Sequence, residues 1–496
     1  MNVCKRDVRW IYACVAVLSF SRSAYAMGLS RDTDANVPVS VIRSHSGLDT
    51  PAPVGLSLIR IGRSKVDVGL TIEGSWGTFI NGKSYQQMPL DTFNNWQYVT
   101  YYDQHRRLSI ARRRLPAGPW QVIHFDDYLF KGNDNHNVTV LGICPSDGTI
   151  HLAFDHHGDP LHYRVSKPGA AGEPEKVAWT AELFSEVRDG LLPGRKIESV
   201  TYPRFVRVAR GNLLFVRRHG SHLDGRIMLC EYVPAKGGWS ESWQVTDSSG
   251  TYEFDGITST NRNAYLNGVH FDHVRGRLHL SWHWREGGGF GVAQHDLNYA
   301  YSSDGGRTWF NSAGARIGGQ GRFIGIDTPG LAVWKISPAR GLDNQEGQCV
   351  DALGRPHVMT WHLRQGEPDL KPGTKKEAKS AYYHYWREAD GTWRRIELPY
   401  PVDKSERNRP KILSTPNSDL VGMFNIQGKI VLCGATASNA YRDWGTLLID
   451  EGPWDGEPLP DLTRWREQGV LSIYMQKDPP QAGRPTDLYI LDFKLR

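Results

Sequence analysis

Long apolar runs are almost absent from this chain, and the one near its start is short. Trp10–Phe20 is shorter than the roughly 18 apolar residues that a membrane-spanning helix needs. It follows a basic stretch, Met1–Arg9, and precedes the small-residue sequence Ala24-Tyr25-Ala26. This order is typical of a secretory signal that is cleaved after Ala26. We therefore expect no membrane insertion, removal of residues 1–26, and a secreted or periplasmic product.

Cysteine and net charge are also low. Two of the six cysteines would leave with the signal, so that residues 27–496 keep Cys144, Cys230, Cys349 and Cys433. So few cysteines over so long a chain exclude a disulfide-dense scaffold, and a hydrophobic core must supply the stability. The formal net charge of +6 drops to +3 when the charged residues of the signal are removed. A charge this small indicates no nucleic-acid partner and is compatible with an acidic substrate.

Helical periodicity is scarce as well. Short apolar runs rich in β-branched and aromatic residues recur between Gly, Asp and Asn turns. The segment Gly148-Thr-Ile-His-Leu-Ala-Phe matches segments that begin at Gly276 and Gly354 and, more loosely, at Gly211. In chain order these glycines lie 63, 65 and 78 positions apart, and a second strand-like run follows each copy. The pattern predicts an all-β protein made of repeated strand units.

A turn with a tryptophan completes the repeat. Ser302–Trp309 reads S-x-D-x-G-x-T-W, an Asp-box, in which the Asp and Thr side chains cap a β-hairpin turn. Asp390–Trp393 and Gly237–Trp239 are degenerate copies. Units of this length indicate about seven blades, and we predict a seven-bladed β-propeller that forms one domain, residues 27–496. The last strand-like run is expected to pair with an early one and remove a free sheet edge: Asp487–Phe493 with Val54–Ile61 or Val66–Ile72.

The repeat separates two groups of polar residues. One group shares a single repeat position, which indicates packing or hydrogen bonding rather than chemistry: His151, His279 and His357. The strand ends differ. The sixth residue after that position is His157 in one unit and Arg285 in another, and Arg218 ends the strand of a third. Because equivalent strand ends point to one face of a propeller, these side chains are expected to converge.

Two further candidates lie outside the repeat. His136 sits in a polar turn, Asn133–Asn137, that leads into the run Val138–Ile143. Tyr202 directly precedes Pro203, which is expected to keep Tyr202 extended. With the histidine and arginine at the strand ends, they supply a base, an acid and a cation. These are the groups that proton abstraction next to a carboxylate requires.

In combination these motifs resemble the BNR-type seven-bladed propeller lyases, a family that includes ulvan lyases and L-rhamnose–D-glucuronate lyases. The likeness is carried by His136, by Phe154–Arg164 with its Asp-x-His-x-x-Pro-Leu pattern, and by Thr201–Phe205 followed by Phe215–Arg218. Further matching segments extend the likeness over residues 130–365: Ala264–Gly268 and Asn344–His362.

The resemblance assigns roles to particular residues. It implies an active site of His136, His157, Tyr202 and Arg218, with Tyr265 and Arg285 as further substrate contacts. Family members can also hold a structural zinc, for which the matching residues are His222, Cys230, Cys349 and His362. Four Cys and His ligands imply a closed structural site. A Cys230–Cys349 disulfide is the alternative in an oxidising compartment, and no organic cofactor is expected.

The expected function is cleavage of a uronic-acid polysaccharide, ulvan-like or with a rhamnose–glucuronate linkage, by β-elimination. Arg218 would neutralise the uronate carboxylate, and Tyr202, the leading candidate for the base, would share the base and acid roles with His157. His136 would orient the substrate. A sialidase-like glycoside hydrolase and a non-catalytic carbohydrate-binding propeller are the alternatives, but hydrolysis needs paired carboxyl groups. We expect a monomer whose partner is the acidic polysaccharide.

Overall fold

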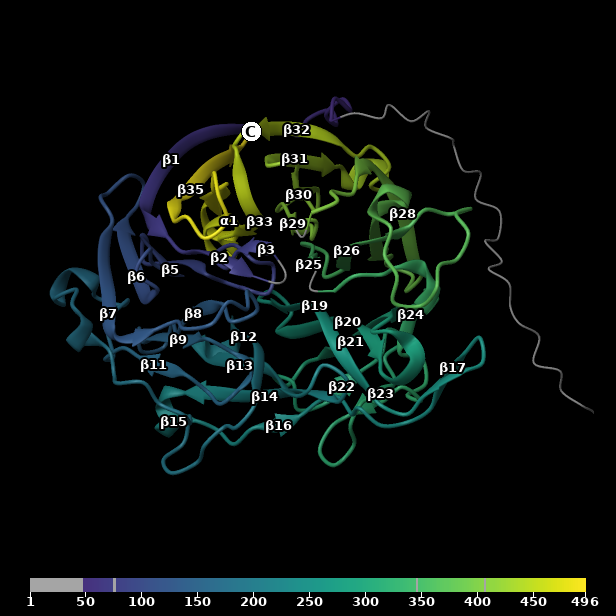
Figure 1. Cartoon of the computed structure of the whole chain (residues 1–496), viewed down its shortest axis with the longest axis horizontal. Coiled ribbons are helices and arrows are strands. Elements are labelled where there is room, and N and C mark those ends of the chain that lie inside the picture. The colour runs from purple at the N-terminus through teal and green to yellow at the C-terminus, as the bar shows by residue number, and fades with distance from the viewer. Residues whose placement is uncertain (1–47, 75–76, 345–346, 406) are drawn as a thin grey trace, which may run out of the picture. The chain divides into compact units, whose positions relative to one another are not determined.

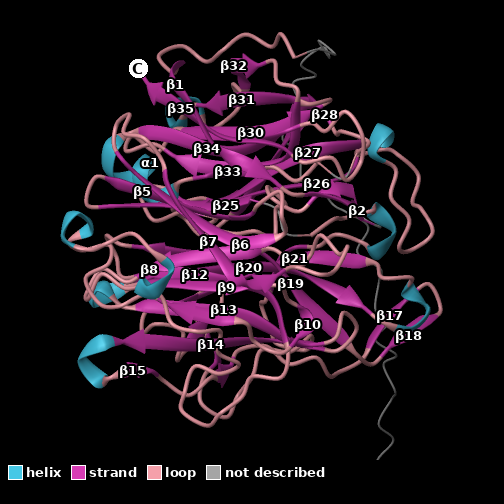
Figure 2. Ribbon diagram, turned by 60° about the vertical axis from the view of Figure 1, so that its left-hand side comes forward, coloured by secondary structure: helices cyan, strands magenta, loops and turns pink. Residues whose placement is uncertain are grey.

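The computed structural model describes residues 48–496 with the exception of 75–76, 345–346 and 406. The expected signal, residues 1–26, and the expected start of the domain at residue 27 lie outside the described residues. Strands make up most of the regular structure, and the described part of the chain also contains one short α-helix, α1 (Leu462–Gln468), and eight short 3₁₀ helices (Figure 2). Among these residues, no helix combines the length and the apolar character needed to span a membrane. The all-β prediction is confirmed.

Four sheets of the described chain contain four antiparallel strands each. The first consists of β33 (Trp454–Pro460), β34 (Val470–Lys477), β35 (Thr486–Leu495) and β1 (Leu58–Gly69). The second consists of β4 (Leu90–Phe93), β5 (Trp96–Tyr102), β6 (Arg107–Arg114) and β7 (Gln121–Leu129). The third consists of β25 (Gly347–Val350), β26 (Pro356–Leu363), β27 (Ser380–Arg387) and β28 (Trp393–Pro401). The fourth consists of β29 (Lys411–Ser414), β30 (Leu420–Ile426), β31 (Lys429–Ala435) and β32 (Gly445–Asp450).

A larger sheet of twelve strands consists of two antiparallel runs that meet at one parallel residue pair, Gly225 with Asn263. One run contains β10 (His157–Asp159), β12 (Val200–Arg207), β13 (Leu213–Gly220), β14 (Gly225–Val233), β15 (Gly238–Trp239) and β16 (Trp243–Gln244). The other contains β19 (Arg262–Asp272), β20 (Arg277–Glu286), β21 (Gln294–Ser302), β22 (Trp309–Phe310), β23 (Arg316–Gly318) and β24 (Ala332–Trp334). A three-stranded sheet and two hairpins accompany it: β8 (Thr139–Ile143), β9 (Ile150–Phe154) and β11 (Tyr163–Val165); β2 (Thr71–Gly74) and β3 (Gly77–Phe79); β17 (Tyr252–Phe254) and β18 (Ile257–Ser259).

The first and last strands pair with each other. β1 lies antiparallel to β35, with Leu58 opposite Leu495 and Gly69 opposite Thr486, and Figure 1 shows purple β1 close to yellow β35. The predicted pairing of the last strand-like run with an early one is confirmed, and β1 spans parts of both candidate runs. The pairing gives β35 a hydrogen-bonded neighbour on each side, β34 and β1, so that neither of its edges is free.

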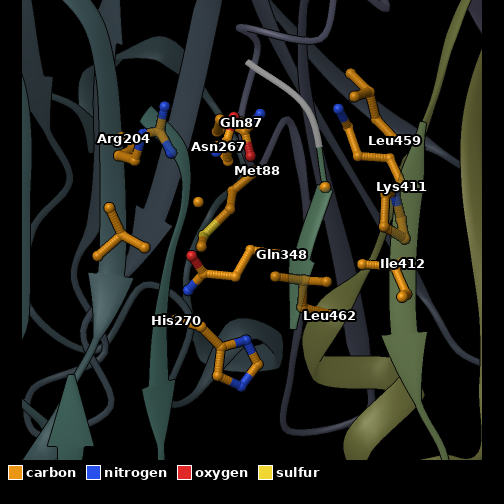
Figure 3. Close-up of a pocket in the computed structure, with 14 residues that line it drawn as sticks. Gln87, Met88, Arg204, Asn267, His270, Gln348, Lys411, Ile412, Leu459 and Leu462 are labelled. Atoms are coloured by element: carbon orange, nitrogen blue, oxygen red, sulfur yellow. The ribbon is translucent and has the colours of Figure 1, made fainter. Parts of the chain in front are cut away.

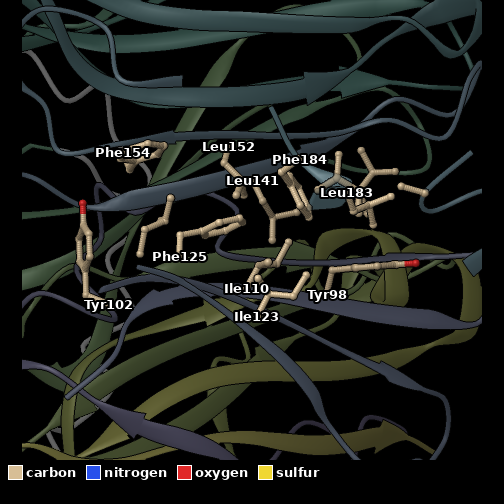
Figure 4. Packing of buried hydrophobic residues seen from close by; sticks show 14 of the residues in the cluster. Tyr98, Tyr102, Ile110, Ile123, Phe125, Leu141, Leu152, Phe154, Leu183 and Phe184 are labelled. Atoms are coloured by element: carbon tan, nitrogen blue, oxygen red, sulfur yellow. The ribbon is translucent and has the colours of Figure 1, made fainter. Parts of the chain in front are cut away.

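The core lies between the faces of successive sheets. Figure 4 shows Tyr98 of β5 and Ile110 of β6 in one cluster with Leu141 of β8 and Leu152 of β9. All four side chains are buried. Burial of a Leu or Ile side chain stabilises a fold by about 1.5–3 kcal/mol, so this apolar layer fixes the position of one sheet against the next.

The repeated histidines are structural, as predicted. His151, His279 and His357 are buried, and Nδ1 of each forms a hydrogen bond with a side chain on the next strand of its sheet. The partners are Tyr163 at 2.6 Å, Tyr299 at 2.7 Å and His384 at 2.9 Å, respectively. The histidine side chain at the repeated position therefore links two adjacent strands of its sheet by a hydrogen bond.

The Asp-box also has the predicted structural role. Its Asp304 carboxylate accepts a hydrogen bond from the backbone N–H of Thr308 at 2.8 Å. The Ser302 hydroxyl accepts from the backbone N–H of Gly306, also at 2.8 Å. These bonds satisfy the backbone of the turn between β21 and β22, and the motif serves the hairpin.

A narrow cavity of about 50 Å³ is bordered by strands from several sheets. Figure 3 shows Arg204 of β12, Asn267 of β19, Gln348 of β25 and Lys411 of β29 around it, and Leu459 of β33 also lines it. Strands that lie far apart in the sequence, from β12 to β33, therefore meet at a common centre.

Candidate active site

Two of the side chains predicted at the strand ends, Arg218 and Arg285, meet at Tyr265 of β19. Arg218 Nη1, from β13, donates to the Tyr265 hydroxyl at 3.3 Å, and Arg285 of β20 donates to the same oxygen. The Arg218 guanidinium also lies over the Tyr202 ring, 5.0 Å from its centroid. Strand pairing explains the arrangement, because Thr201 of β12 stands opposite Arg218 and places Tyr202 beside the guanidinium.

Tyr202 occupies a bulge rather than a regular extended strand. Its φ is +52°, in the left-handed region that a residue with a side chain seldom adopts. Between Thr201 and Arg204, β12 has one residue more than the facing stretch of β13, and Pro203 has no N–H to donate to the ladder. The expectation that Pro203 keeps Tyr202 extended is therefore wrong. Strained backbone of this kind costs about 1–3 kcal/mol and is concentrated at functional sites.

His136 and His157 form a stacked pair that shares one carboxylate. Their ring centroids are 4.1 Å apart, and the ring planes are inclined by 9°. Asp134 Oδ1 accepts a hydrogen bond from His136 Nδ1 at 2.5 Å, and Asp134 Oδ2 accepts from His157 Nδ1 at 2.7 Å. The His136 and Tyr202 ring centroids are 6.1 Å apart. The structure therefore brings together all four residues predicted for the active site.

Three residues that the sequence did not indicate extend the site. The Tyr85 ring stacks on His136 with 4.7 Å between centroids, and it lies 5.2 Å from the Tyr202 ring. The Lys83 ammonium and the Arg409 guanidinium lie 5.4 and 5.3 Å from the Tyr85 centroid. These residues precede β4 and β29 and lie outside the repeated strand motif, so no repeat position distinguishes them.

Asp134 is a further site residue that the sequence analysis did not include, although its place in a polar turn could have indicated it. It lies two residues before His136 in a polar turn, and its Oδ1 accepts the backbone N–H of His136 at 2.9 Å. An aspartate that binds the backbone two residues ahead is a common turn device. The turn could have been predicted from Asn133–Asn137, whereas the second hydrogen bond, to His157, depends on the tertiary fold.

The site carries cationic groups without acidic partners. Arg218 and Arg285 hydrogen-bond to the hydroxyl groups of Tyr265 and Thr201, and neither has a carboxylate partner among the residues that the structure describes. Arg218 is only 3% exposed. A buried charge is costly unless an opposite charge or strong hydrogen bonds compensate it, so this pair of guanidinium groups is suited to an anionic ligand.

Burial and hydrogen bonding determine the protonation states of Tyr202, His136 and Asp134. Burial raises the pKa of Tyr202 well above that of an ordinary phenol; Tyr265 adds to this shift, and the Arg218 charge opposes it. Tyr202 is therefore a neutral phenol. Burial lowers the pKa of His136 to about 4, against the hydrogen bond to Asp134. Burial of Asp134 favours its acid form, but the hydrogen bonds from both histidines prevail and hold its pKa well below the usual range.

The four residues predicted to bind zinc do not form one site. Cys230 packs in a cluster with Phe215 of β13, whereas Cys349 belongs to a different cluster. Both ring nitrogens of His362 are engaged, with the Leu363 carbonyl at 2.9 Å and the Tyr385 hydroxyl at 2.7 Å. His222 is exposed and lies within electrostatic reach of Arg285, Arg218 and His157.

These positions do not fit one tetrahedral zinc site, because Cys230 of β14 belongs to the twelve-stranded sheet, whereas Cys349 and His362 belong to the sheet of β25–β28. The alternative disulfide is also wrong, since Cys230 and Cys349 are free thiols. In the described chain, the group whose potential metal-ligand atoms all lie within 4.8 Å of one another is Asp134, His136 and His157. His222 borders the candidate active site instead.

Several solved structures resemble this fold over most of its length. The crystal structure of polysaccharide lyase Uly1 matches 87% of this chain and 99% of its own chain, with a TM-score of 0.68 and 18% identity. A PL25 ulvan lyase matches 86% and 95%, with a TM-score of 0.60 and 12% identity. Its counterpart bound to -[GlcA(1-4)Rha3S]- has a TM-score of 0.59. At these identities the likeness concerns the fold alone, and it defines the class: a β-propeller-like protein.

The family follows from the repeat itself. Residues 96–400 match the family described as "BNR repeat-containing family member". This match spans more than half of the chain, and the chain belongs to that family. The resemblance to the BNR-type propellers, carried by His136, Phe154–Arg164 and Thr201–Phe205, is confirmed.

Curated relatives share part of the chain. An ulvan lyase, long isoform, of Alteromonas sp. is 24% identical over 266 residues, which cover 45% of this chain and 26% of the relative. The short isoform of Alteromonas sp. (strain LOR) is 23% identical over 269 residues, which cover 45% and 49%. The chain thus spans about half the length of these relatives or less.

Proposed function

We propose that this protein is a polysaccharide lyase that cleaves a uronic-acid-containing polysaccharide by β-elimination and leaves an unsaturated uronate. The observation that carries the proposal is the pair of guanidinium groups, Arg218 and Arg285, that share the Tyr265 hydroxyl and have no carboxylate partner in the described part of the chain. A uronate would supply the missing anion. The ulvan lyases among the relatives support the same reaction class.

Arg218 is assigned to the carboxylate next to the reacting carbon. A guanidinium has five N–H donors in a planar fork, and two hydrogen bonds, to Tyr265 and to Thr201 at 3.0 Å, leave donors for the substrate. Neutralising the carboxylate makes the C5 proton more acidic, because the charge that develops on its removal is stabilised. The Tyr265 oxygen accepts from two arginines, so its own O–H remains to be donated to the substrate.

Tyr202 is assigned as the general acid. The sequence favours this residue as the base, but a base must be deprotonated before it acts. Burial keeps the pKa of Tyr202 well above its usual value, and the neutral phenol is ready to donate its proton to the departing O4 oxygen.

The base then comes from the histidine pair. An imidazole whose Nδ1 donates to Asp134 presents the lone pair of Nε2, and Nε2 takes the C5 proton as the C5–H bond breaks. The electron pair of the C4–O4 bond leaves with O4, which receives the proton of Tyr202. Proton return from the imidazolium to the phenolate restores both groups, and no water is added to the product.

We infer that the substrate is ulvan-like or contains a rhamnose–glucuronate linkage, because the curated relatives are named ulvan lyases. We also propose that the protein is secreted or periplasmic, on the basis of the signal pattern at Met1–Ala26. It would act as a monomer without an organic cofactor.

We further infer that the propeller has seven blades. Division of the twelve-stranded sheet at its single parallel pair yields seven antiparallel sheets of at least three strands, besides the hairpins β2–β3 and β17–β18. We assign β4, β8, β12, β19, β25, β29 and β33 as their inner strands. Five of these strands border the cavity in Figure 3, namely β12, β19, β25, β29 and β33. Such a centre is expected of inner strands around a propeller axis.

Digestion of a panel of uronic-acid polysaccharides tests the reaction class. We expect ultraviolet absorbance from an unsaturated uronate with at least one of them, ulvan included in the panel. In ¹⁸O-labelled water the products should carry no label at the cleaved bond. Labelled, saturated products would instead show hydrolysis and rule out the elimination.

A further inference from the structure

We propose that Asp134 is a positioning residue that holds His136 and His157 as one unit, with Nδ1 of both rings as hydrogen-bond donors and Nε2 of both neutral rings as acceptors. The proposal deepens the function proposed above and rests on it. Its basis is geometric: each carboxylate oxygen of Asp134 serves one ring, at 2.5 and 2.7 Å, while the rings stack at 4.1 Å.

The carboxylate joins two segments that the sequence separates. Asp134 and His136 belong to the turn before β8, where Asp134 Oδ1 also accepts the backbone N–H of His136 at 2.9 Å. His157 begins β10. A second link joins the same segments, because the Asn137 amide donates to Asp155 Oδ1 at 2.6 Å. Asp159 Oδ2 accepts the backbone N–H of His157 at 2.8 Å and fixes its backbone.

The hydrogen bonds determine the tautomers. An ionised carboxylate only accepts hydrogen bonds, so Nδ1 of both rings must carry the proton. In a neutral ring Nε2 is then an acceptor, and its orientation is set by the shared carboxylate. A group that fixes the tautomer and ring position of a histidine without itself reacting is a known device in catalysis. Here the single carboxylate of Asp134 would fix the tautomer and the position of both imidazole rings.

The surroundings favour this role over metal binding. Asp134, His136 and His157 could supply three metal ligands. However, the Lys83 charge acts on His136, and the charges of Arg218 and Arg285 reach His222 beside His157. Nearby positive charges oppose a further cation. A cation bound between them would also replace the two hydrogen bonds that join the Asp134 carboxylate to the rings.

The variant Asp134→Asn tests the proposal. An asparagine keeps the shape but can accept from only one of the two rings, while its N–H group must donate to the other. We expect one imidazole to change from the Nδ1–H to the Nε2–H tautomer, visible in the ¹⁵N spectrum of histidine-labelled protein without substrate. The two rings are assigned by difference with His136→Gln and His157→Gln.

The kinetic arm uses matched variants. For Asp134→Asn we expect kcat to fall by about 10–100-fold with little change in KM. Asp134→Glu, which keeps the carboxylate, should restore part of the activity. Asp390→Asn, in an exposed turn of a degenerate Asp-box where the Asp390 carboxylate accepts the backbone N–H of Thr392 at 2.8 Å, should leave kcat and KM unchanged.

Three results separate the possible outcomes. Unchanged tautomers together with unchanged kcat in Asp134→Asn would overturn the proposal. So would one equivalent of tightly bound zinc in the wild type, with loss of activity on chelation, because Asp134 would then be a metal ligand. If the wild type releases no unsaturated product from any polysaccharide, the proposed function fails, while the ¹⁵N spectra still decide the role of Asp134.

Discussion

At the residue scale, burial acts on neighbouring acids and bases in opposite directions. It keeps Tyr202 protonated and His136 unprotonated, while two hydrogen bonds keep Asp134 ionised. A proton donor and a proton acceptor therefore coexist at one pH with their rings 6.1 Å apart. This separation of pKa values is the condition under which one site supplies both an acid and a base.

Arg218→Ala should abolish nearly all turnover at every pH, because the uronate charge would then oppose removal of the C5 proton throughout. Arg218→Lys keeps a charge but loses the planar fork, and we expect it to recover only a small part of the activity. Initial rates across the pH range provide the measurement. Arg466→Ala, on the exposed side of α1, is the control. Wild-type rates in Arg218→Ala would exclude the assigned role.

Tyr202→Phe should lower kcat by about 10²-fold or more, the usual scale for loss of general acid catalysis. The ring and its contacts with Tyr85 and Tyr265 remain, so the thermal unfolding temperature should change little. Tyr489→Phe, whose hydroxyl bonds Asp487 at 3.2 Å, is the matched control. A substrate with a better leaving group should be less sensitive to Tyr202→Phe; equal sensitivity would count against the acid role.

At the scale of single elements, strand ends carry the chemistry and strand interiors hold the sheets. In β9 and β20, the same repeat position supplies a buried histidine, His151 or His279, that binds a tyrosine on the next strand. Arg285, six residues after His279, reaches the Tyr265 hydroxyl. The histidine at the repeated position therefore stabilises the sheet, whereas the residue at the strand end, which differs between units, contributes to the candidate active site.

His151→Asn should reduce stability while the folded fraction keeps nearly its normal turnover. The change removes hydrogen bonds to Tyr163 at 2.6 Å and to Thr149 at 2.8 Å from a fully buried position. Unsatisfied buried groups cost about 1–3 kcal/mol each. Chemical denaturation and active-site titration separate the two effects, and His105→Asn, on an exposed turn, is the control. Loss of turnover in folded protein would contradict the structural role of the repeat.

These contrasts explain how much the sequence could predict. His157, Arg218 and Arg285 were accessible because each departs from a repeat at a strand end. Tyr85 and Arg409 were not, because they come from loops that only the tertiary fold brings to His136 and Tyr202. The predicted zinc ligands do not meet for a related reason. The spacing of Cys230 and Cys349 in the sequence does not indicate in which hydrophobic cluster each side chain is buried. The extended conformation predicted for Tyr202 from Pro203 was wrong, because the bulge in β12 outweighs the usual effect of a proline on the residue before it.

At the scale of the whole molecule, many histidines are buried in neutral form. Burial lowers the pKa of His151 and His279 to about 3 and that of His270 and His283 to about 4. In the unfolded chain a histidine has a pKa of about 6.5. Below that value the unfolded state therefore binds protons that the folded state does not, and stability must fall.

We expect the free energy of unfolding to decrease as the pH falls from about 6.5 toward 3–4, by about 1.4 kcal/mol per pKa unit for each such group. Thermal unfolding temperatures measured across this range provide the test. In His279→Gln, which cannot be protonated, the decrease should be less steep than in the wild type. An identical slope in both proteins would show that His279 does not contribute.

Leu491→Ala in β35 should destabilise the protein by about 2–5 kcal/mol, the range for a buried leucine. Leu491 stands opposite Arg63 of β1 and Ile473 of β34, and its side chain is fully buried. Lys494→Ala, at an exposed position of the same strand, is the control. Equal unfolding temperatures for the two variants would mean that the closing strand contributes little.

The pairing of β1 with β35 has a consequence for the kinetics of folding. In its sheet β1 is hydrogen-bonded to β35 alone, and Leu58 of β1 pairs with Leu495 of β35. Contact between strands that lie so far apart in the sequence closes a very long loop, and this loss of chain entropy precedes the gain from the contacts themselves. We therefore expect the sheet of β1 to form late, after the sheets whose strands are neighbours in the sequence.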